Sequence, residues 1–389
     1  MYAQIFKEAK NMKEEMVQWR RRLHQIPETG LDLPQTAAFV REKLDSFQIP
    51  YDTLVNGNCI VAHLGKGEGC LLLRADMDAL PMKEETGLPF ASQNDNMHAC
   101  GHDLHAAALL AAAKILKSHE EDLKCAVKLM FQPAEEIFAG ARSAIGEGVL
   151  ENPQVDAAMV IHVDSTRATG NIAYGTQCNA SVYGFKITLK GKGTHGAMPQ
   201  DGIDPINAGV HLYLGLQELI ARECNPCQDV VLTIGQFSAG NTANVIPEQA
   251  VLQGTLRAFG KEVRTRLIQR IKEVIQGVSV TCRVQAELEV LSDVPALCTD
   301  EEGNVRFAEV FSQMSPGLKI HSGVHSMASE DFAFVSERVP SSCFMIGAKP
   351  AEVQFPWAHH NPRVCFSEDA IPIAAAVYAC AALSWQRKD

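Results

Sequence analysis

Three short apolar runs in the first half of the chain each lead into polar residues that can bind a metal or move a proton. The runs span residues 70–73, 126–131 and 157–161. The polar residues that follow them are Asp76 and Asp78, Glu135 and Glu136, and His162. Such runs alternate with helical segments such as 105–116, which predicts an α/β fold with a mainly parallel sheet and helices on both faces. Because the carboxyl ends of parallel strands form the ligand crevice, we expect these polar residues to share one edge of the sheet.

The segments on either side of these runs complete the predicted fold. Apolar residues with a 4-3-4-3-4 spacing predict one long amphipathic helix at the start: Ile5, Ala9, Met12, Met16, Trp19 and Leu23. In the middle, strands are predicted at 182–189, 230–237, 250–257 and 279–290, and helices at 204–222 and 261–276. The order β-α-β-β-α-β is typical of a ferredoxin-like α+β domain. After residues 293–295, α/β patterning returns with a strand at 343–346 and a helix from Glu368. We therefore predict a discontinuous domain of residues 1–179 and 291–389, interrupted by an inserted domain of residues 180–290.

The charge and composition exclude several classes of function. With 35 Lys+Arg against 46 Asp+Glu, the 389-residue chain carries a formal charge of −11, which is a poor match for nucleic acid. It lacks a basic amphipathic helix for a membrane surface, and its longest apolar stretch is shorter than a membrane span of ~18 residues. The twelve cysteines are scattered, which favours buried reduced thiols. We predict a cytoplasmic protein that binds neither nucleic acid nor membrane.

The strongest local signal is the segment 98–105, His-Ala-Cys-Gly-His-Asp-Leu-His, directly before a helix. Cys100 and His102 are separated by one glycine, so a thiolate and an imidazole can face one metal ion. A Cys-x-His pair also arises by chance, and no Cys-x-x-Cys arm stands nearby. Cys224 and Cys227 have that spacing, but they lie in a polar loop without a histidine, and we interpret them as non-ligands.

Three further signals each have a plain structural alternative. Neighbouring carboxylates in an extended segment point apart, so one of Glu135 and Glu136 can bind a metal while the other serves as general base. The alternative is a solvated loop pair. His162 is also compatible with a hydrogen-bonded interior residue, and the segment His359-His360-Asn-Pro with a surface turn.

Together the signals indicate a site for two metal ions. The five candidate ligands are Cys100, His102, Glu136, His162 and His360. Asp76 or Asp78 can stand behind them as hydrogen-bond partners. Five ligands and a bridging water suit two ions roughly 3.5–4 Å apart. Thiolate and imidazole favour zinc, whereas a carboxylate also admits manganese, cobalt or nickel.

Ordered motifs extend from about residue 14 to the C-terminus. They are Arg-Arg-x-Leu-His at His24, Arg74-Ala-Asp76-Met-Asp78-Ala-Leu-Pro81, His98-Ala-Cys100-Gly-His102-Asp103, Gln132-Pro-Ala-Glu135-Glu136, Lys192-Gly-Thr-His195-Gly-Ala-Met-Pro199, Asn241-Thr-Ala-Asn244-Val-Ile-Pro247, Gly254-Thr-Leu-Arg257-Ala-Phe, Ser329-Glu330-Asp331-Phe332 and His360-Asn-Pro362. With these motifs the chain resembles the M20 metallopeptidase family, and within it the amidohydrolase branch of aminoacylase-like and hippurate-hydrolase-like enzymes.

This resemblance implies a role for each predicted domain and for the candidate site residues. The discontinuous domain would be a zinc-exopeptidase-like catalytic domain, and the inserted domain a lid through which two chains form a homodimer. Cys100 would bridge two metal ions, and the other four ligands would complete the two sites. Glu135 would be the general base, and Asp76 would orient a metal-bound imidazole.

The implied reaction is hydrolysis of the amide that joins an acyl group to an amino acid. The metal ions would lower the pKa of a bridging water and polarise the carbonyl, while Glu135 takes the proton and delivers it to the departing amine. The alternatives are a dipeptidase and a catalytically silent binding protein on the same fold. A thiol redox role for Cys224 and Cys227 is a further alternative.

Three predicted site residues lie in the inserted domain. His195 falls in a GxGxxG pattern, but Pro199 follows instead of a helix, which argues against a dinucleotide site. The resemblance makes His195 an oxyanion stabiliser that can reach a neighbouring subunit's metals. It also implies that Asn244 and Arg257 bind the substrate's carboxylate or carbonyl, for which an arginine fork is suited. Read from the residues alone, Asn244 and Arg257 are a turn residue and a surface charge.

The chain departs from the branch at three places. Residues 364–366 are Val-Cys-Phe where Phe-Asp-Phe is usual, and Ala328 replaces a common glycine. Residues 164–167 are Asp-Ser-Thr-Arg where the branch usually has a proline-containing segment. No ligand is lost, and these loops bear on substrate choice.

Overall fold

The chain folds into two compact units in a computed structural model that describes residues 1–354 and 356–387. Unit 1 consists of Met1–Cys178, Cys298–His325 and Asp331–Asp389, and unit 2 of Asn179–Leu297 and Ser326–Glu330. The short strands β7 (Gln177–Asn179) and β14 (Leu297–Cys298) lie where the chain passes from one unit to the other. The domain ranges predicted from the sequence stay a prediction.

Unit 1 is built on a sheet of eight described strands in the order β1-β2-β4-β3-β5-β16-β6-β15. Their bounds are β1 Tyr51–Leu54, β2 Cys59–Leu64, β3 Cys70–Asp76, β4 Ala126–Gln132, β5 Ala157–Ala168, β6 Asn171–Tyr174, β15 Lys319–Ser322 and β16 Ser341–Lys349. The central strands β4, β3, β5 and β16 are parallel, and antiparallel pairs occur towards both edges. Every residue of β3 is buried, as expected for a parallel strand covered on both faces.

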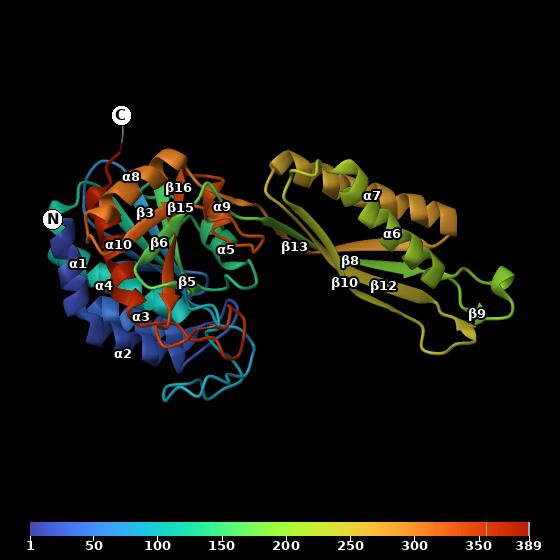
Figure 1. Cartoon of the computed structure of the whole chain (residues 1–389), viewed down its shortest axis with the longest axis horizontal. Helices are drawn as coiled ribbons and strands as arrows, with labels where there is room; N and C mark the ends of the chain where they lie inside the picture. Colours follow the sequence, from blue (N-terminus) through green and yellow to red (C-terminus); the bar gives the residue numbers. More distant parts are fainter. Residues whose placement is uncertain (355, 388–389) are drawn as a thin grey trace. The chain divides into compact units, whose positions relative to one another are not determined.

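Helices cover both faces of this sheet (Figure 1). Their bounds are α1 Tyr2–Asn11, α2 Lys13–His24, α3 Pro34–Ser46, α4 His102–Ser118, α5 Gly140–Gly146, α8 Glu301–Ser312, α9 Ala333–Ser336 and α10 Ala370–Ser384, with a 3-10 turn at Glu120–Asp122. The apolar helix α10 is buried almost all round and packs against α4, with α1 and α2 outside them. The predicted α/β class, with a parallel sheet core between helices, is confirmed.

The predicted first helix is interrupted. It forms two helices, α1 and α2, that meet at Met12, where φ is −89° and ψ is 3°. The predicted apolar stripe still faces the core, because Ile5, Ala9, Met16 and Trp19 are all buried. The spacing therefore identified the buried face correctly and missed the break in the backbone.

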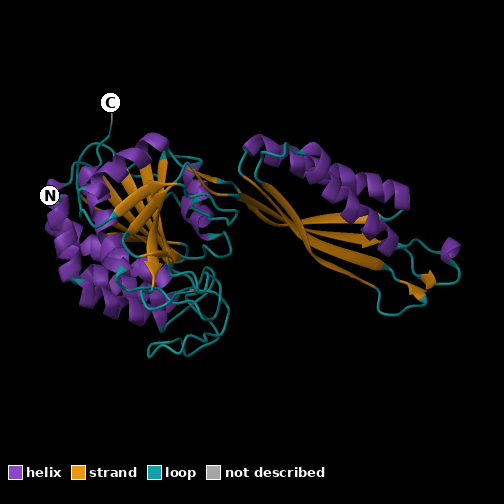
Figure 2. Ribbon diagram, in the orientation of Figure 1, coloured by secondary structure: helices purple, strands orange, loops and turns teal. Residues whose placement is uncertain are grey.

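Unit 2 contains an antiparallel sheet in the order β10-β12-β8-β13, with two helices packed on it (Figure 2). The bounds are β8 Ser181–Lys190, α6 Pro205–Glu223, β10 Val230–Ala239, β12 Gln249–Ala258, α7 Lys261–Cys282 and β13 Gln285–Val294. The small pair β9 (Thr194–His195) and β11 (Val245–Ile246) and a 3-10 turn at Pro199–Asp201 complete it. The predicted order of strands and helices is confirmed.

One boundary in unit 2 was predicted wrongly. Residues 279–282 were expected to start a strand, but they form the last turn of α7, which ends where Arg283 adopts φ 63°. Val278 and Cys282 continue the stripe of apolar residues that packs on the core of unit 2. The helical spacing therefore outweighs the β-branched residues of this segment.

The parallel strands of unit 1 end at different heights, and this opens the crevice. β3 pairs with β5 only as far as Arg74 and Val160, whereas β16 continues beside β5 to Gly347 and Asp164. His162 was predicted to follow the end of a strand, but it lies inside β5, beyond the last pair with β3. Its side chain thus reaches the crevice because the neighbouring strand has ended. Within the described residues, no helix is long and apolar enough to cross a membrane.

Candidate metal centre

Cys100 and His102 are presented by a tight turn into α4. Gly101 between them adopts φ 86° and caps the helix. A Cβ atom at this position would lie 2.5 Å from Cγ2 of Val163, so only glycine fits without movement. This turn places the buried thiol directly before α4 and the fully buried imidazole on the first residue of the helix.

The five predicted ligands lie in one cluster within unit 1. Cys100 Sγ is 3.4 Å from Nε2 of His162. Glu136 Oε1 is 3.9 Å from Nε2 of His102 and 3.4 Å from Nε2 of His360. Cys100, His102 and Glu136 form one group of ligand atoms within 4.8 Å of one another. The thiol of Cys100 thus stands between an imidazole on β5 and a carboxylate after β4.

Two atoms of this cluster are buried without a good partner. His102 Nε2 and Glu136 Oε1 each make no well-formed hydrogen bond in the described part of the chain. Buried polar atoms are normally paired, since leaving one unpaired costs roughly 1–3 kcal/mol. An imidazole nitrogen and a carboxylate oxygen that face each other at 3.9 Å fit a divalent cation between them. The donor set therefore fits a metal site.

The electrostatics of the cluster also attract positive charge. Burial lowers the pKa of His102, but the charges of Asp76 and Cys100 outweigh it and hold that pKa well above its usual value. Close polar contacts with the thiol of Cys100 and the carboxylate of Glu136 raise the pKa of His360 to about 10. The anionic donors therefore stabilise a cation at this place, a role that a proton or a metal ion can take.

Asp78 fixes the ligand imidazole and the two glutamates at once. Its backbone oxygen accepts a hydrogen bond from Nδ1 of His102 at 2.9 Å, which leaves Nε2 free for a metal. Its carboxylate accepts the backbone N–H groups of Glu135 and Glu136 at 2.9 and 3.1 Å. One buried aspartate thus sets the tautomer of His102 and the direction of the loop after β4.

Asp76 holds His105 by a hydrogen bond and lies 3.5 Å from Nε2 of His102. Its Oδ1 accepts from Nδ1 of His105 at 2.5 Å, and its Oδ2 accepts from Arg74 at 2.7 Å. The other ring nitrogen of His105 accepts the backbone N–H of Val163 at 2.9 Å, so His105 has no lone pair left for a metal. Arg74 is fully buried and also donates to Asp331 at 3.0 Å. Asp76 therefore supports the ring packed behind His102 rather than Nδ1 of His102 itself.

A second buried network holds the start of α4. Asp103, next to the ligand His102, accepts from Nε of Arg20 at 2.6 Å and from Nδ1 of His24 at 2.9 Å. The other ring nitrogen of His24 lies 3.1 Å from Glu84. Arg20 and His24 belong to the Arg-Arg-x-Leu-His motif and Asp103 to the His98–Asp103 motif, so two sequence motifs meet in one ion-pair network.

The predicted residues of unit 2 fall at its two ends. His195 on β9 and Val245 on β11 are paired, so His195 lies next to Asn244, and both side chains are exposed. Arg257, near the end of β12, donates to the backbone oxygen of Met327 at 2.8 Å and is half-buried. The structure therefore brings His195 and Asn244 together and leaves Arg257 apart from them.

Some residues of the site had no predicted role. His105 and His359 were seen in their motifs but given no function, and Arg74 was seen only as a motif residue. For His105 the helical spacing of three residues from His102 was an available signal. The pair Cys224 and Cys227 belongs to no group of three metal-ligating side chains among the described residues.

Unit 1 is thus an α/β fold in which thiol, imidazole and carboxylate groups cluster at the carboxyl edge of the parallel strands. The family model described as "Peptidase family M20/M25/M40" matches residues 72–384. The chain therefore belongs to this peptidase family, as the motifs indicated.

Individual relatives cover nearly the whole chain. It is 38% identical over 368 residues to the N-acetyl-L-cysteine deacetylase of Bacillus subtilis (strain 168), covering 92% of this chain and 85% of that protein. A solved structure from methicillin-resistant Staphylococcus aureus superposes with a TM-score of 0.92 and 32% identity, covering 98% of this chain and 99% of the other. The YXEP protein of Bacillus subtilis, described as a dinuclear metal binding peptidase from the M20 family, matches with a TM-score of 0.82 and 31% identity, covering 96% and 98%.

Proposed function

We propose that the chain hydrolyses the amide bond of N-acyl amino acids and releases a carboxylic acid and a free amino acid. The observation that carries this proposal is the set of ligand atoms around Cys100, with Glu135 beside them at the end of β4. The N-acetyl-L-cysteine deacetylase of Bacillus subtilis, which is 38% identical over 368 residues, is named for a substrate with an acetyl group on the nitrogen of an amino acid. The cluster and the relative therefore support the same class of substrate.

We assign two divalent metal ions to Cys100, His102, Glu136, His162 and His360. When bound, such ions polarise a carbonyl and lower the pKa of water. The YXEP protein of Bacillus subtilis, described as a dinuclear metal binding peptidase, supports the number of two ions. Zinc suits the thiolate and imidazoles best, and manganese, cobalt and nickel remain compatible with the carboxylate. Metal analysis of protein purified without chelator, by mass spectrometry, identifies the ion.

Glu135 is the proposed general base. It is nearly buried, and its backbone N–H is fixed by the carboxylate of Asp78. Its neighbour Glu136 points into the ligand cluster, so the two carboxylates serve separate tasks, as expected for adjacent residues in an extended segment. Glu135 takes a proton from the attacking water and delivers it to the nitrogen of the departing amine.

The test is a hydrolysis screen with added metal ions. Wild-type protein and Glu135→Gln are assayed with N-acetyl and N-benzoyl amino acids and with dipeptides that carry a free amine. We expect turnover of the N-acyl compounds and a loss of about 10²–10⁴-fold in the variant, with the same metal content. Turnover of dipeptides alone would establish a dipeptidase, and inert metal-loaded protein would establish a binding protein. Unchanged turnover in the variant would exclude Glu135 as the base.

We further propose that the active site is completed by a second copy of the chain. Gln249 on β12 lies opposite Lys190, where β8 ends and the chain leads on towards His195. Arg257 is eight positions further along β12, so the two positions are roughly 26 Å apart. A single small substrate cannot contact both His195 and Arg257 of one chain. We therefore propose that His195 and Asn244 act at the metal cluster of a second copy of the chain, and Arg257 stays a predicted substrate-binding residue.

An apolar face on α6 supports such a dimer. Ile206, Val210, Tyr213 and Leu214 recur at helical spacing and are 39–56% exposed. Exposed apolar residues in one stripe are typical of an interface. In light scattering we expect a dimer for the wild type and a monomer for Leu214→Glu; a wild-type monomer would contradict the proposal. A cytoplasmic location stays a prediction from the sequence.

A further inference from the structure

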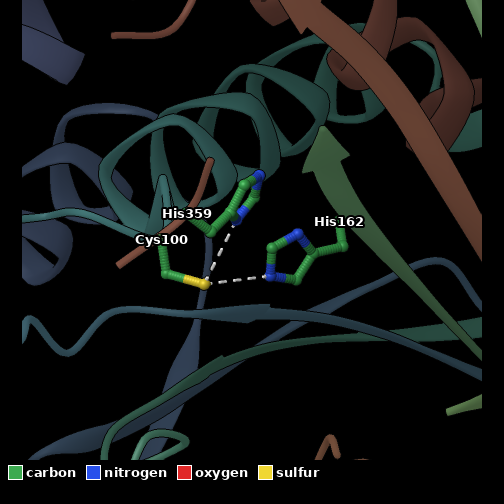
Figure 3. A group of neighbouring side chains, drawn as sticks. All are labelled: Cys100, His162 and His359. Carbon is green, nitrogen blue, oxygen red and sulfur yellow. Dashed lines mark hydrogen bonds between the residues drawn. The ribbon is translucent and has the colours of Figure 1, made fainter. Parts of the chain in front are cut away.

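Two histidines face the thiol of Cys100 from different parts of unit 1 (Figure 3). Nε2 of His162 lies 3.4 Å from Sγ, and Nδ1 of His359 lies 3.5 Å from it. The three side chains form a group compact enough to hold an ion. The hydrogen bonds of the two rings show that His162 turns a lone pair towards the sulfur, whereas His359 turns an N–H towards it.

His162 presents a lone pair. Its Nδ1 lies 2.7 Å from the backbone oxygen of Val163, which can only accept a hydrogen bond, so Nδ1 carries the proton. The neutral ring then has its lone pair on Nε2, the atom that faces Sγ. This is the tautomer of a metal ligand, as proposed for His162 above.

His359 presents a hydrogen. Its Nε2 accepts the backbone N–H of Ser165 at 3.2 Å, so Nε2 holds the lone pair and Nδ1 holds the proton. Nδ1 is the atom that faces Sγ of Cys100. Were Nδ1 to bind a metal instead, the proton would move to Nε2 and stand against the N–H of Ser165.

Ser165 is available for this contact because the ladder between β5 and β16 is interrupted there. The register shifts between Gly347, opposite Asp164, and Lys349, opposite Ala168. The hydroxyl of the fully buried Ser165 donates to the backbone oxygen of Trp357 at 3.0 Å and so anchors the segment that carries His359.

The ring of His359 is also held from the side. Phe366 meets it edge-on, with the ring centroids 5.2 Å apart and the planes at 88°. The backbone N–H of the next residue, His360, donates to the oxygen of Ala99 at 3.1 Å, which ties this segment to the turn that carries Cys100. The distance from Nδ1 to Sγ is therefore fixed by both segments.

We propose that His359 is a positioning residue that donates its Nδ1–H to the thiolate of Cys100 and is not a metal ligand. This inference rests on the proposed function, in which Cys100 is a metal-bound thiolate. A hydrogen bond to a ligand sulfur draws electron density away from it and so tunes the bond from sulfur to metal. It also fixes which side of the sulfur remains open to the ions.

The test uses protein loaded with cobalt(II), whose thiolate charge-transfer band reports the electron density on sulfur. His359→Phe removes the donor, and we expect the band to move to longer wavelength while the protein still binds two cobalt ions. His359→Asn returns an amide N–H close to the place of Nδ1, and the band should move back towards the wild-type position. His119→Phe, beyond the far end of α4, is the matched control and should leave the band unchanged.

Each other outcome overturns the inference. Loss of one cobalt ion in His359→Phe, with circular dichroism like that of the wild type, would make His359 a ligand. An unmoved band in both variants would show that no hydrogen bond reaches the sulfur. If His359→Phe fails to fold, the comparison of His359→Asn with wild type decides, because a ligand replaced by an amide would weaken cobalt binding. Absence of any thiolate band in the wild type would instead refute the proposed metal site.

Discussion

The two groups of proposed site residues are held by the chain in opposite ways. In unit 1 the ligand His102 is buried and set by Asp78, which also holds Glu135. In unit 2, His195 and Asn244 are exposed, and their nearest polar contacts lie within their own loops. The difference teaches that the chain organises its metal-binding half by itself, whereas the half proposed to touch substrate has few contacts before a partner or substrate arrives.

The largest expected effect concerns the buried arginine of unit 1. Arg74→Met leaves Asp76 and Asp331 buried without their cation, so unit 1 should lose about 3–5 kcal/mol of unfolding free energy. Arg257→Met in unit 2 removes only hydrogen bonds to Met327 and Ser329, worth about 1–3 kcal/mol.

Urea titration measures both variants. All three tryptophans, at positions 19, 357 and 385, lie in unit 1, so their fluorescence follows that unit, and circular dichroism follows the whole chain. Equal losses for the two arginines would break the contrast between the units.

His195 should show the reverse behaviour. His195→Ala is expected to lower kcat about 10²–10³-fold, as for loss of an oxyanion donor. Its side chain is exposed, so the free energy of unfolding should change by less than about 0.5 kcal/mol. A steady-state assay and a urea titration of the same preparation check both numbers.

Mixing this variant with Glu135→Gln sharpens the comparison further. If His195 acts across the dimer, remixed subunits should regain roughly a quarter of wild-type activity, because half the dimers are mixed and each has one intact site. A mixture as inactive as its parents, after exchange of subunits is verified, would assign His195 to its own chain.

Asp78 has a matched control in unit 2. Asp78→Asn should weaken metal binding about 10- to 100-fold, because the carboxylate that holds the two glutamate N–H groups is lost. Asp204, at the start of α6, also accepts two backbone N–H groups, and Asp204→Asn should leave metal affinity unchanged. Competition with a chromophoric chelator measures the affinity, and an equal effect of both variants would remove Asp78 from the metal site.

The smallest expected effect is a pH dependence of stability. Burial lowers the pKa of His24, but Asp103 and Glu84 outweigh it and hold that pKa above its usual value. A raised pKa in the folded state means that the proton stabilises the fold below about pH 6.5 and that this contribution is lost as the pH rises through the folded-state pKa. His24→Asn should therefore lose more unfolding free energy at pH 6 than at pH 9, as followed by tryptophan fluorescence. A loss that is greater at pH 9 would reverse the sign and contradict the pairing.

The sequence was sufficient for the class of fold and for the family, since apolar runs and motifs are local patterns. It did not reveal that β5 continues past His162, because that depends on where β3 ends and on pairing with β16. The ion pair of Arg74 with Asp331 joins residues 257 positions apart, and no periodicity reports such a contact. The tautomers of His162 and His359 depend on single backbone groups, Val163 and Ser165, which only three-dimensional neighbours identify. The roles of Asn244 and Arg257 stay predictions.

The pairing of β5 with β16 has a consequence for the order in which the chain folds. β5 cannot pair with β16 until residues 341–349 have been synthesised, and all of unit 2 is synthesised before them. Until then the edge of β5 that pairs with β16 has no partner strand. An unpaired strand edge can associate with other chains. Folding of unit 2 during this interval shortens the loop that must close, because its two ends, near Asn179 and Leu297, are brought together. The pairing of β7 with β14 at the base of unit 2 would therefore bring β16 closer to β5 before the sheet of unit 1 is complete.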